Sequence, residues 1–279
     1  MQLWEQFTIE HGGRRGESVR YSGVIIDVDG TVVRGSEPIE GANAGLETID
    51  RAGLSRLFVS NNPTKPPSAY VDRLGSAGIS VREGDVLTAG VVTVEYLREE
   101  HPDDRLFVIG EPGVITLLRD AGLPVTDDPS RAEVLVASVD YDFDYDDMRT
   151  ALEILSEPSV AFVGTDPDVV IPAAEGDVPG TGAILHAIEG VTGREPDAIA
   201  GKPSEFAASM AFDRLGVDPS ECLVVGDRLD TDVRLGSRTG ATTALVRTGV
   251  TDRRVLSESP IEPDYVLDSI GDIDRILSR

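Results

Sequence analysis

Two aspartates that could do chemistry follow the first apolar segment of the chain. Residues 24–26 (VII) lead into the pentapeptide DVDGT, which places Asp27 and Asp29 two positions apart. Reactive groups of open α/β sheets collect at the carboxyl ends of the strands, so a buried strand ending here presents both carboxylates at that edge. One carboxylate can then attack a substrate while the other faces the leaving group. An ordinary Asp-Gly turn is the alternative for this pentapeptide taken alone.

A second apolar segment ends in the polar run SNNPTK at residues 60–65. The Ser60 hydroxyl and free backbone N–H groups at a strand-to-helix junction suit the oxygens of a phosphoryl group. Helix capping explains Ser and Asn at this place without any ligand, because both residue types favour the start of a helix. Both interpretations stay open at this point.

A lysine marks the third segment, GKPS at residues 201–204. The chain has 25 basic residues, and only Lys65 and Lys202 among them are lysines. A compact ammonium group at a strand end can neutralise a nucleophilic carboxylate and a bound phosphate. A lysine at the surface is the alternative.

The fourth segment, VVGDRLDTD at residues 224–232, again runs from an apolar strand into acids. Hard oxygen ligands at a strand end suit Mg²⁺, which proteins usually hold with one or two carboxylates plus water and phosphate. Asp227 and Asp232 are the candidates, and for Asp230 the alternative is a cap of the following helix.

Together and in this order, the four segments resemble the motifs of the haloacid dehalogenase superfamily of phosphohydrolases. Residues 61–79 and 164–204 are similar to its nitrophenylphosphatase and phosphoglycolate-phosphatase branch, subfamily IIA. The resemblance extends over residues 21–270 and implies Mg²⁺-dependent hydrolysis of small phosphate monoesters through an aspartyl-phosphate. A phosphotransferase or mutase with the same intermediate, and a phospho-accepting signalling module, are the alternatives.

The same resemblance implies a role for each matching residue. Asp27 is the implied nucleophile, Asp29 the acid and base, and Lys202 the residue that holds phosphoryl oxygens beside them. The implied metal ligands are Asp27, the backbone carbonyl of Asp29, Asp227 and Asp232. The implied substrate-binding residues are Ser60, Asn61, Asn62, Thr165 and Asp166. Related enzymes commonly have Asn in place of Asp166, so this acid either faces the substrate or is a solvated surface residue.

Alternating apolar runs and helical patterns predict the elements that hold these residues. They favour an α/β fold with a doubly wound, Rossmann-like parallel sheet. The expected strands are 22–27, 55–60, 85–89, 105–109, 133–138, 159–163, 197–201, 221–226 and 241–246, with one more beyond residue 263. The expected helices are 41–52, 66–77, 90–100, 112–121, 145–156, 181–192, 203–215 and 230–239, with one more at the C-terminus.

Charge divides the chain into two parts. Residues 101–195 hold 20 acidic and 5 basic residues, a large share of the formal net charge of −25. We therefore predict an inserted α/β cap at 101–195, a catalytic core at 21–100 and 196–279, and an N-terminal extension at 1–20. The alternative is one continuous sheet with an acidic edge.

Composition excludes several classes of function. A net charge of −25 opposes binding to nucleic acid and to anionic membranes. We find neither an 18-residue apolar stretch nor a hydrophobic signal core, which predicts a cytoplasmic protein. A single Cys222 and three scattered histidines give neither an internal disulfide nor a zinc site. The acid-rich, lysine-poor composition is typical of proteins from high-salt cytoplasm, and the resemblance suggests a homodimer formed through the caps.

Overall fold

The computed structural model describes residues 20–172 and 176–278, so nearly all of the predicted N-terminal extension at 1–20 lies outside the described residues. The chain divides into two compact units. The first contains the chain up to residue 59, residues 73–81, and the chain from residue 211 onward. The second contains residues 60–72 and 82–210. The cap boundaries at 101–195 remain a prediction.

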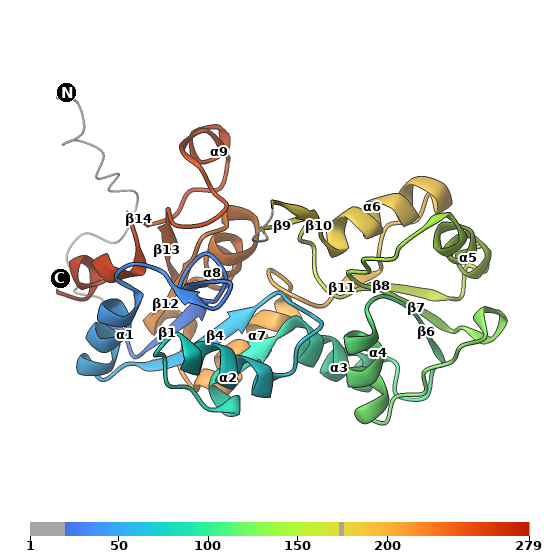
Figure 1. The fold of residues 1–279 in the computed structure, drawn as a ribbon, viewed down its shortest axis with the longest axis horizontal. Coiled ribbons are helices and arrows are strands. Elements are labelled where there is room, and N and C mark those ends of the chain that lie inside the picture. The colour runs from blue at the N-terminus through green and yellow to red at the C-terminus, as the bar shows by residue number, and fades with distance from the viewer. Residues whose placement is uncertain (1–19, 173–175, 279) are drawn as a thin grey trace. The chain divides into compact units, whose positions relative to one another are not determined.

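A parallel sheet forms the centre of the first unit (Figure 1). Its strands are β1 (Gly23–Asp27), β4 (Ser55–Ser60), β12 (Cys222–Gly226), β13 (Thr242–Val246) and β14 (Tyr265–Leu267). They are ordered β14-β13-β12-β1-β4, and each neighbouring pair is parallel. Every residue of β1 and β12 is buried, as the continuous apolar runs predict for strands covered on both faces.

Helices and one hairpin complete this part of the fold. The helices are α1 (Ala42–Arg51), α8 (Arg234–Thr239), α9 (Arg253–Glu258) and α10 (Asp274–Leu277), and the hairpin pairs β2 (Val33–Arg34) with β3 (Glu37–Pro38). Helices α2 (Pro67–Ser76) and α7 (Glu205–Leu215) each begin in the second unit and end in the first. Helix α1 buries Ala42, Leu46 and Ile49, which lie on one helical face.

The second unit has a four-stranded parallel sheet of its own, ordered β11-β8-β7-β6. Its strands are β6 (Leu106–Ile109), β7 (Val134–Ala137), β8 (Ala161–Gly164) and β11 (Ala198–Ile199). Its helices are α3 (Ala89–Glu100), α4 (Pro112–Asp120), α5 (Tyr145–Leu155) and α6 (Thr181–Thr192). This unit also contains β5 (Val86–Thr88) and the hairpin of β9 (Val170–Ile171) with β10 (Val178–Pro179).

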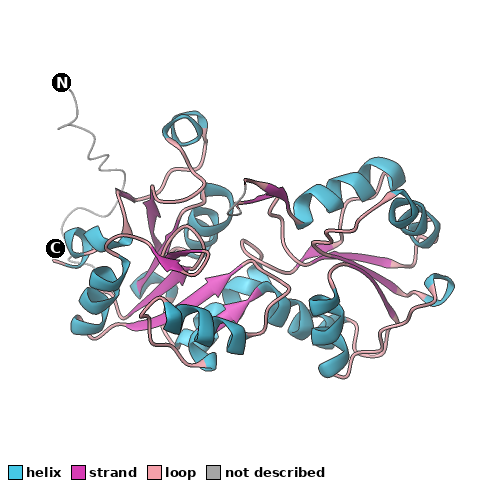
Figure 2. Ribbon diagram, viewed as in Figure 1, coloured by secondary structure: helices cyan, strands magenta, loops and turns pink. Residues whose placement is uncertain are grey.

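Helices cover both faces of this sheet (Figure 2). Successive side chains of a strand point to opposite faces, and β7 follows this rule. Leu135 and Ala137 pack in one apolar cluster with residues of α5 and α6. Val134 and Val136 pack in another with residues of α3 and α4. Each face therefore has its own core.

The predicted fold class is confirmed, while some details differ from the expectation or its alternative, including α9, which no expected helix covers. A single continuous sheet is wrong, because β6, β7, β8 and β11 form a separate sheet. The helix expected at 230–239 begins as a π-helical turn at Leu229–Val233 and becomes α-helical only at Arg234. The short hairpins lack a periodic pattern long enough to predict them. Among the described residues, no helix is long and apolar enough to cross a membrane.

Candidate active site

Asp27 and Asp227 lie at the same edge of the first sheet because they follow neighbouring strands. Strand β1 ends at Asp27, and Asp227 comes directly after β12. The two strands are parallel, with Ile26 opposite Val225. Both carboxylates therefore emerge at the carboxyl end of the sheet, as the sequence predicts.

Asp232 reaches the same edge through the π-helical turn that follows β12. Its Oδ2 accepts a hydrogen bond from the backbone N–H of Arg228 at 3.1 Å, which folds the side chain back toward the strand. Gly226 leaves the necessary space, since a Cβ there would lie 2.2 Å from the Asp232 carboxyl carbon. The wider turn is thus explained by the position of this carboxylate. Single-turn π-helical segments often occur at functional sites.

These three aspartates form what we call the carboxylate cluster: Asp27, Asp227 and Asp232. One oxygen from each lies within 4.8 Å of the others. The residues are 9%, 2% and 2% exposed, respectively. Burying three like charges together is unfavourable without positive charge between them. Three carboxylate oxygens this close together are a set of hard donors that can hold a metal ion.

Two glycines make room for Asp227. Gly30, at φ 84°, occupies a backbone conformation that favours glycine, and a Cβ there would lie 2.6 Å from Asp227 Oδ2. A Cβ on Gly249 would lie only 1.8 Å from the same oxygen. The next residue, Val250, donates its N–H to Asp227 Oδ2 at 2.6 Å. The sequence did not point to the loop with Gly249 and Val250, which follows β13, the strand beside β12.

Asp29 lies outside this cluster, and its side chain is 50% exposed. Arg73 of α2 holds both of its carboxylate oxygens: Nη1 donates to Oδ2 at 3.2 Å, and Nη2 donates to Oδ1. The Asp27 carboxylate accepts a hydrogen bond from the Thr31 hydroxyl at 3.2 Å. The two acids of the DVDGT segment therefore have different surroundings. The predicted metal contact of the Asp29 carbonyl remains a prediction.

In the second unit, Asn61 links the second and third segments of the sequence. Its Oδ1 accepts the N–H of Lys202 at 2.8 Å, and its Nδ2 donates to the carbonyl of Lys202 at 3.1 Å. This pair of bonds fixes the loop that carries the lysine. Lys202 is only 2% exposed, so the alternative of a surface lysine is wrong. The Ser60 hydroxyl is paired with the hydroxyl of Tyr70 at 2.8 Å, a partner that we did not predict.

Asn62 serves a local turn. Its Oδ1 accepts from both the N–H and the hydroxyl of Thr64, at 2.8 and 2.9 Å. Such turns are the usual reason for Asn at a strand-to-helix junction. Its predicted contact with substrate remains a prediction.

Asp166 is buried, which contradicts the alternative of a solvated surface acid. Its Oδ2 accepts from the hydroxyls of Thr165 and Thr181 at 3.0 and 2.6 Å, and its Oδ1 accepts the N–H of Asp168 at 3.2 Å. Burial, reinforced by the neighbouring charge of Asp168, raises the pKa of Asp166 to about 7. Asp168 Oδ1 also accepts a hydrogen bond from Asn61 Nδ2 at 3.4 Å. Through Asn61, Asp168 is connected to the loop that carries Lys202.

Comparisons with known proteins agree with this arrangement. Residues 24–124 match the family model described as haloacid dehalogenase-like hydrolase, and residues 199–273 match a second model of HAD-like hydrolases. The acid sugar phosphatase of Staphylococcus epidermidis is 34% identical over 88% of this chain and 93% of its own length. The chain belongs to the haloacid dehalogenase-like hydrolases.

Further relatives match this hydrolase over most of its length. The sugar-phosphatase AraL of Bacillus subtilis is 31% identical over 91% of this chain and 93% of its own. The solved p-nitrophenyl phosphatase from Archaeoglobus fulgidus has a TM-score of 0.84 at 37% identity, covering 92% of this chain and 99% of that one. The resemblance to the nitrophenylphosphatase branch is confirmed by this neighbour.

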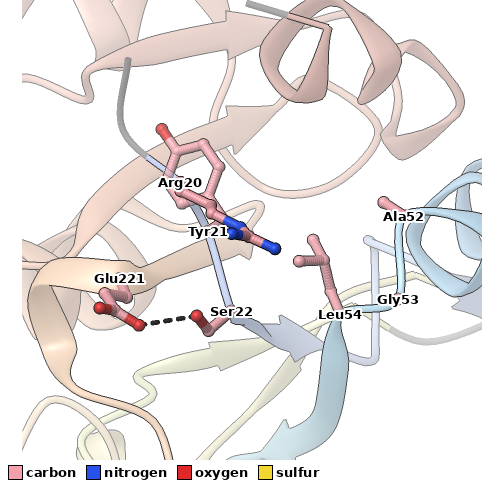
Figure 3. Close-up of a pocket in the computed structure, with 7 residues that line it drawn as sticks. All are labelled: Arg20, Tyr21, Ser22, Ala52, Gly53, Leu54 and Glu221. Carbon is pink, nitrogen blue, oxygen red and sulfur yellow. Dashed lines mark hydrogen bonds between the residues drawn. The ribbon is translucent and has the colours of Figure 1, made fainter. Parts of the chain in front are cut away.

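A pocket of the hydrolase lies at the amino ends of the strands of the first sheet, opposite the end that carries the carboxylate cluster (Figure 3). Ser22 and Glu221 precede β1 and β12, and the Ser22 hydroxyl donates to Glu221 Oε2 at 2.6 Å. The lining residues are Arg20, Tyr21, Ser22, Ala52, Gly53, Leu54 and Glu221. This hollow at the amino ends of the strands contains none of the predicted site residues.

Proposed function

We propose that this hydrolase cleaves small phosphate monoesters with Asp27 as the nucleophile and Asp29 as the acid and base. The observation that carries the proposal is the carboxylate cluster at the carboxyl ends of β1 and β12. Ser60, Asn61 and Lys202 are proposed to hold the phosphoryl oxygens of the same substrate. The names of the relatives, which include sugar phosphatases and nitrophenyl phosphatases, support this class of reaction.

The proposed reaction has two steps. An oxygen of Asp27 forms a bond to phosphorus while the bond from phosphorus to the ester oxygen breaks, and Asp29 gives its proton to that oxygen. Water then attacks the aspartyl-phosphate, Asp29 takes a proton from the water, and the bond between Asp27 and phosphorus breaks. Alcohol and free phosphate are the products, and both aspartates return to their starting states.

Magnesium is the proposed cofactor, held by Asp27, Asp227 and Asp232 together with the backbone carbonyl of Asp29. When bound, the ion supplies positive charge that offsets the carboxylates and the phosphate. Phosphoryl transfer depends mostly on positioning and charge stabilisation. The buried ammonium of Lys202 is proposed to add charge on the side of the phosphoryl oxygens.

Substitution of the nucleophile tests this function. We expect Asp27→Asn to abolish phosphate release from a panel of sugar phosphates, glycerol phosphate, phosphoglycolate and nitrophenyl phosphate with Mg²⁺, because an amide is a poor nucleophile. Unchanged circular dichroism and melting temperature serve as the control for folding. Normal turnover by the folded variant contradicts the proposal. Transfer of phosphate to an added sugar in place of its release supports the phosphotransferase or mutase alternative.

Composition supports two finer proposals, and the family resemblance suggests a third. We infer a cytoplasmic protein adapted to high salt, since 50 acidic residues and only two lysines give a strongly hydrated, negative surface. The same charge disfavours nucleic acid as a partner. A homodimer formed through the caps is the proposed assembly.

A further inference from the structure

Arg73 connects the proposed acid and base to a second part of the first unit. Its Nη1 and Nη2 donate to the two carboxylate oxygens of Asp29, and its Nε donates to the carbonyl of Gly35 at 2.6 Å. Gly35 lies in the turn between β2 and β3, directly downstream of the DVDGT segment. One guanidinium group therefore ties α2, the Asp29 side chain and this hairpin together.

The geometry points to an orienting role for Arg73, because its ion pair with Asp29 contributes little to stability. The side chains of Arg73 and Asp29 are 24% and 50% exposed, and pairs this open to solvent contribute little to the free energy of folding. A bidentate contact, however, fixes both oxygens of a carboxylate in one plane, which a lysine cannot do. Each oxygen keeps a second lone pair, which can bind the proton that Asp29 gives to the leaving group and takes back from water.

We propose that Arg73 is a positioning residue that holds the Asp29 carboxyl group for proton exchange with the leaving group and the attacking water. The inference rests on the proposed function, because it needs Asp29 to be the acid and base. General acid–base catalysis requires the proton donor within hydrogen-bonding reach of the reacting oxygen. Loss of Arg73 leaves Asp29 free to rotate in solvent.

Leaving groups of different quality separate this role from a structural one. Phenyl phosphate needs a proton on its departing oxygen more than 4-nitrophenyl phosphate does, because the nitro group stabilises the phenolate. We expect Arg73→Ala to lower kcat/KM about tenfold on phenyl phosphate, a part of the roughly 10²- to 10⁴-fold that a general acid supplies. On 4-nitrophenyl phosphate the expected loss is less than about threefold, and Arg73→Lys should fall between Arg73→Ala and the natural protein.

Arg56 offers a matched control in the same unit. It pairs with Asp50 at 3.2 Å and donates to the carbonyl of Ser80 at 3.0 Å, and its side chain is 20% exposed. Arg56→Ala thus removes an ion pair and a bond to a carbonyl at a similar depth, together with a contact of the guanidinium over the Phe58 ring. We expect it to change kcat/KM by the same small factor on both substrates.

A double-mutant cycle completes the test. In an Asp29→Ala background, Arg73→Ala should cause no further loss on phenyl phosphate, because the group that it positions is gone. Equal losses on both substrates, or additive losses in the cycle, overturn the proposal. If Asp27→Asn stays active, the proposed function has failed. If Asp27→Asn is inactive and Asp29→Ala shows the leaving-group dependence that Arg73→Ala lacks, only the role of Arg73 has failed.

Discussion

Carboxylates are buried at two places in this hydrolase, and the two places differ in what surrounds the negative charge. In the first unit, the carboxylate cluster gathers three acids within 4.8 Å. In the second, Asp166 is enclosed by two threonine hydroxyls and a backbone N–H, and its pKa is raised to about 7. Several carboxylates close together repel one another, and a bound cation removes that repulsion. A single desolvated carboxylate can instead become neutral by binding a proton. Asp166, Asp227 and Asp232 are all 2% exposed, so the difference teaches that the neighbours of a buried aspartate decide what it can bind.

Filling the space beside the carboxylate cluster is expected to have the largest effect. The Cβ of Gly249→Ala would lie 1.8 Å from Asp227 Oδ2, so the carboxylate must move. A displacement near 1 Å in a catalytic site can lower activity about a hundredfold, and we expect a loss of that size. The measurement is phosphate release as a function of Mg²⁺ concentration.

Gly190 in α6 is the matched control for that substitution. A Cβ there meets no atom within 4 Å, so Gly190→Ala should leave activity unchanged. It should also stabilise the protein by up to about 1 kcal/mol, because alanine favours the helix. Equal activities of the two glycine variants would show that the space around Asp227 does not matter.

The second largest expected effect is that of magnesium on stability, which should depend on the carboxylate cluster and not on Asp166. Binding to the folded state alone raises the free energy of unfolding, by about 2.7 kcal/mol at an ion concentration of 100 Kd. We expect Asp227→Asn to lose this gain and Asp166→Asn to keep it. The measurement is urea unfolding with and without MgCl₂ at constant ionic strength. A full gain in Asp227→Asn would place the ion elsewhere.

A change of pH should affect stability through Asp166 and not through Asp227, and the effect should be somewhat smaller than that of magnesium. The folded pKa of Asp166 is about 7, above its ordinary value of 3.8, so the folded protein binds the extra proton between these values. The associated stability is present at low pH and falls as the pH rises, by about 2 kcal/mol from pH 5 to pH 7.

Asp166→Asn should remove this pH dependence, because its amide does not titrate. Urea unfolding at pH 5 and pH 7 measures the change. Asp227→Asn serves as the comparison, since Asp166 is intact in it and the decrease should persist. An unchanged decrease in Asp166→Asn would assign the titration to another group.

Much of the candidate site follows from the order of residues along the chain. The DVDGT and GDRLDTD segments come after apolar runs, and parallel neighbouring strands bring their ends to one edge. That rule predicts the meeting of Asp27 and Asp227 without any knowledge of side-chain packing. The same rule does not predict the hairpin of β2 and β3, whose strands have only two residues each.

The amino-acid sequence by itself determined which chemical groups stand at the ends of buried strands, because apolar periodicity and strand-end residues are local properties. Only the tertiary structure decided their partners. Asp29 meets Arg73, 44 positions away, and Asp227 meets the loop at Gly249. Asp166 meets Thr181 of α6, and its burial and the nearby charge of Asp168 raise its pKa to about 7. These contacts depend on how separate elements pack in space, which no local pattern of residues encodes.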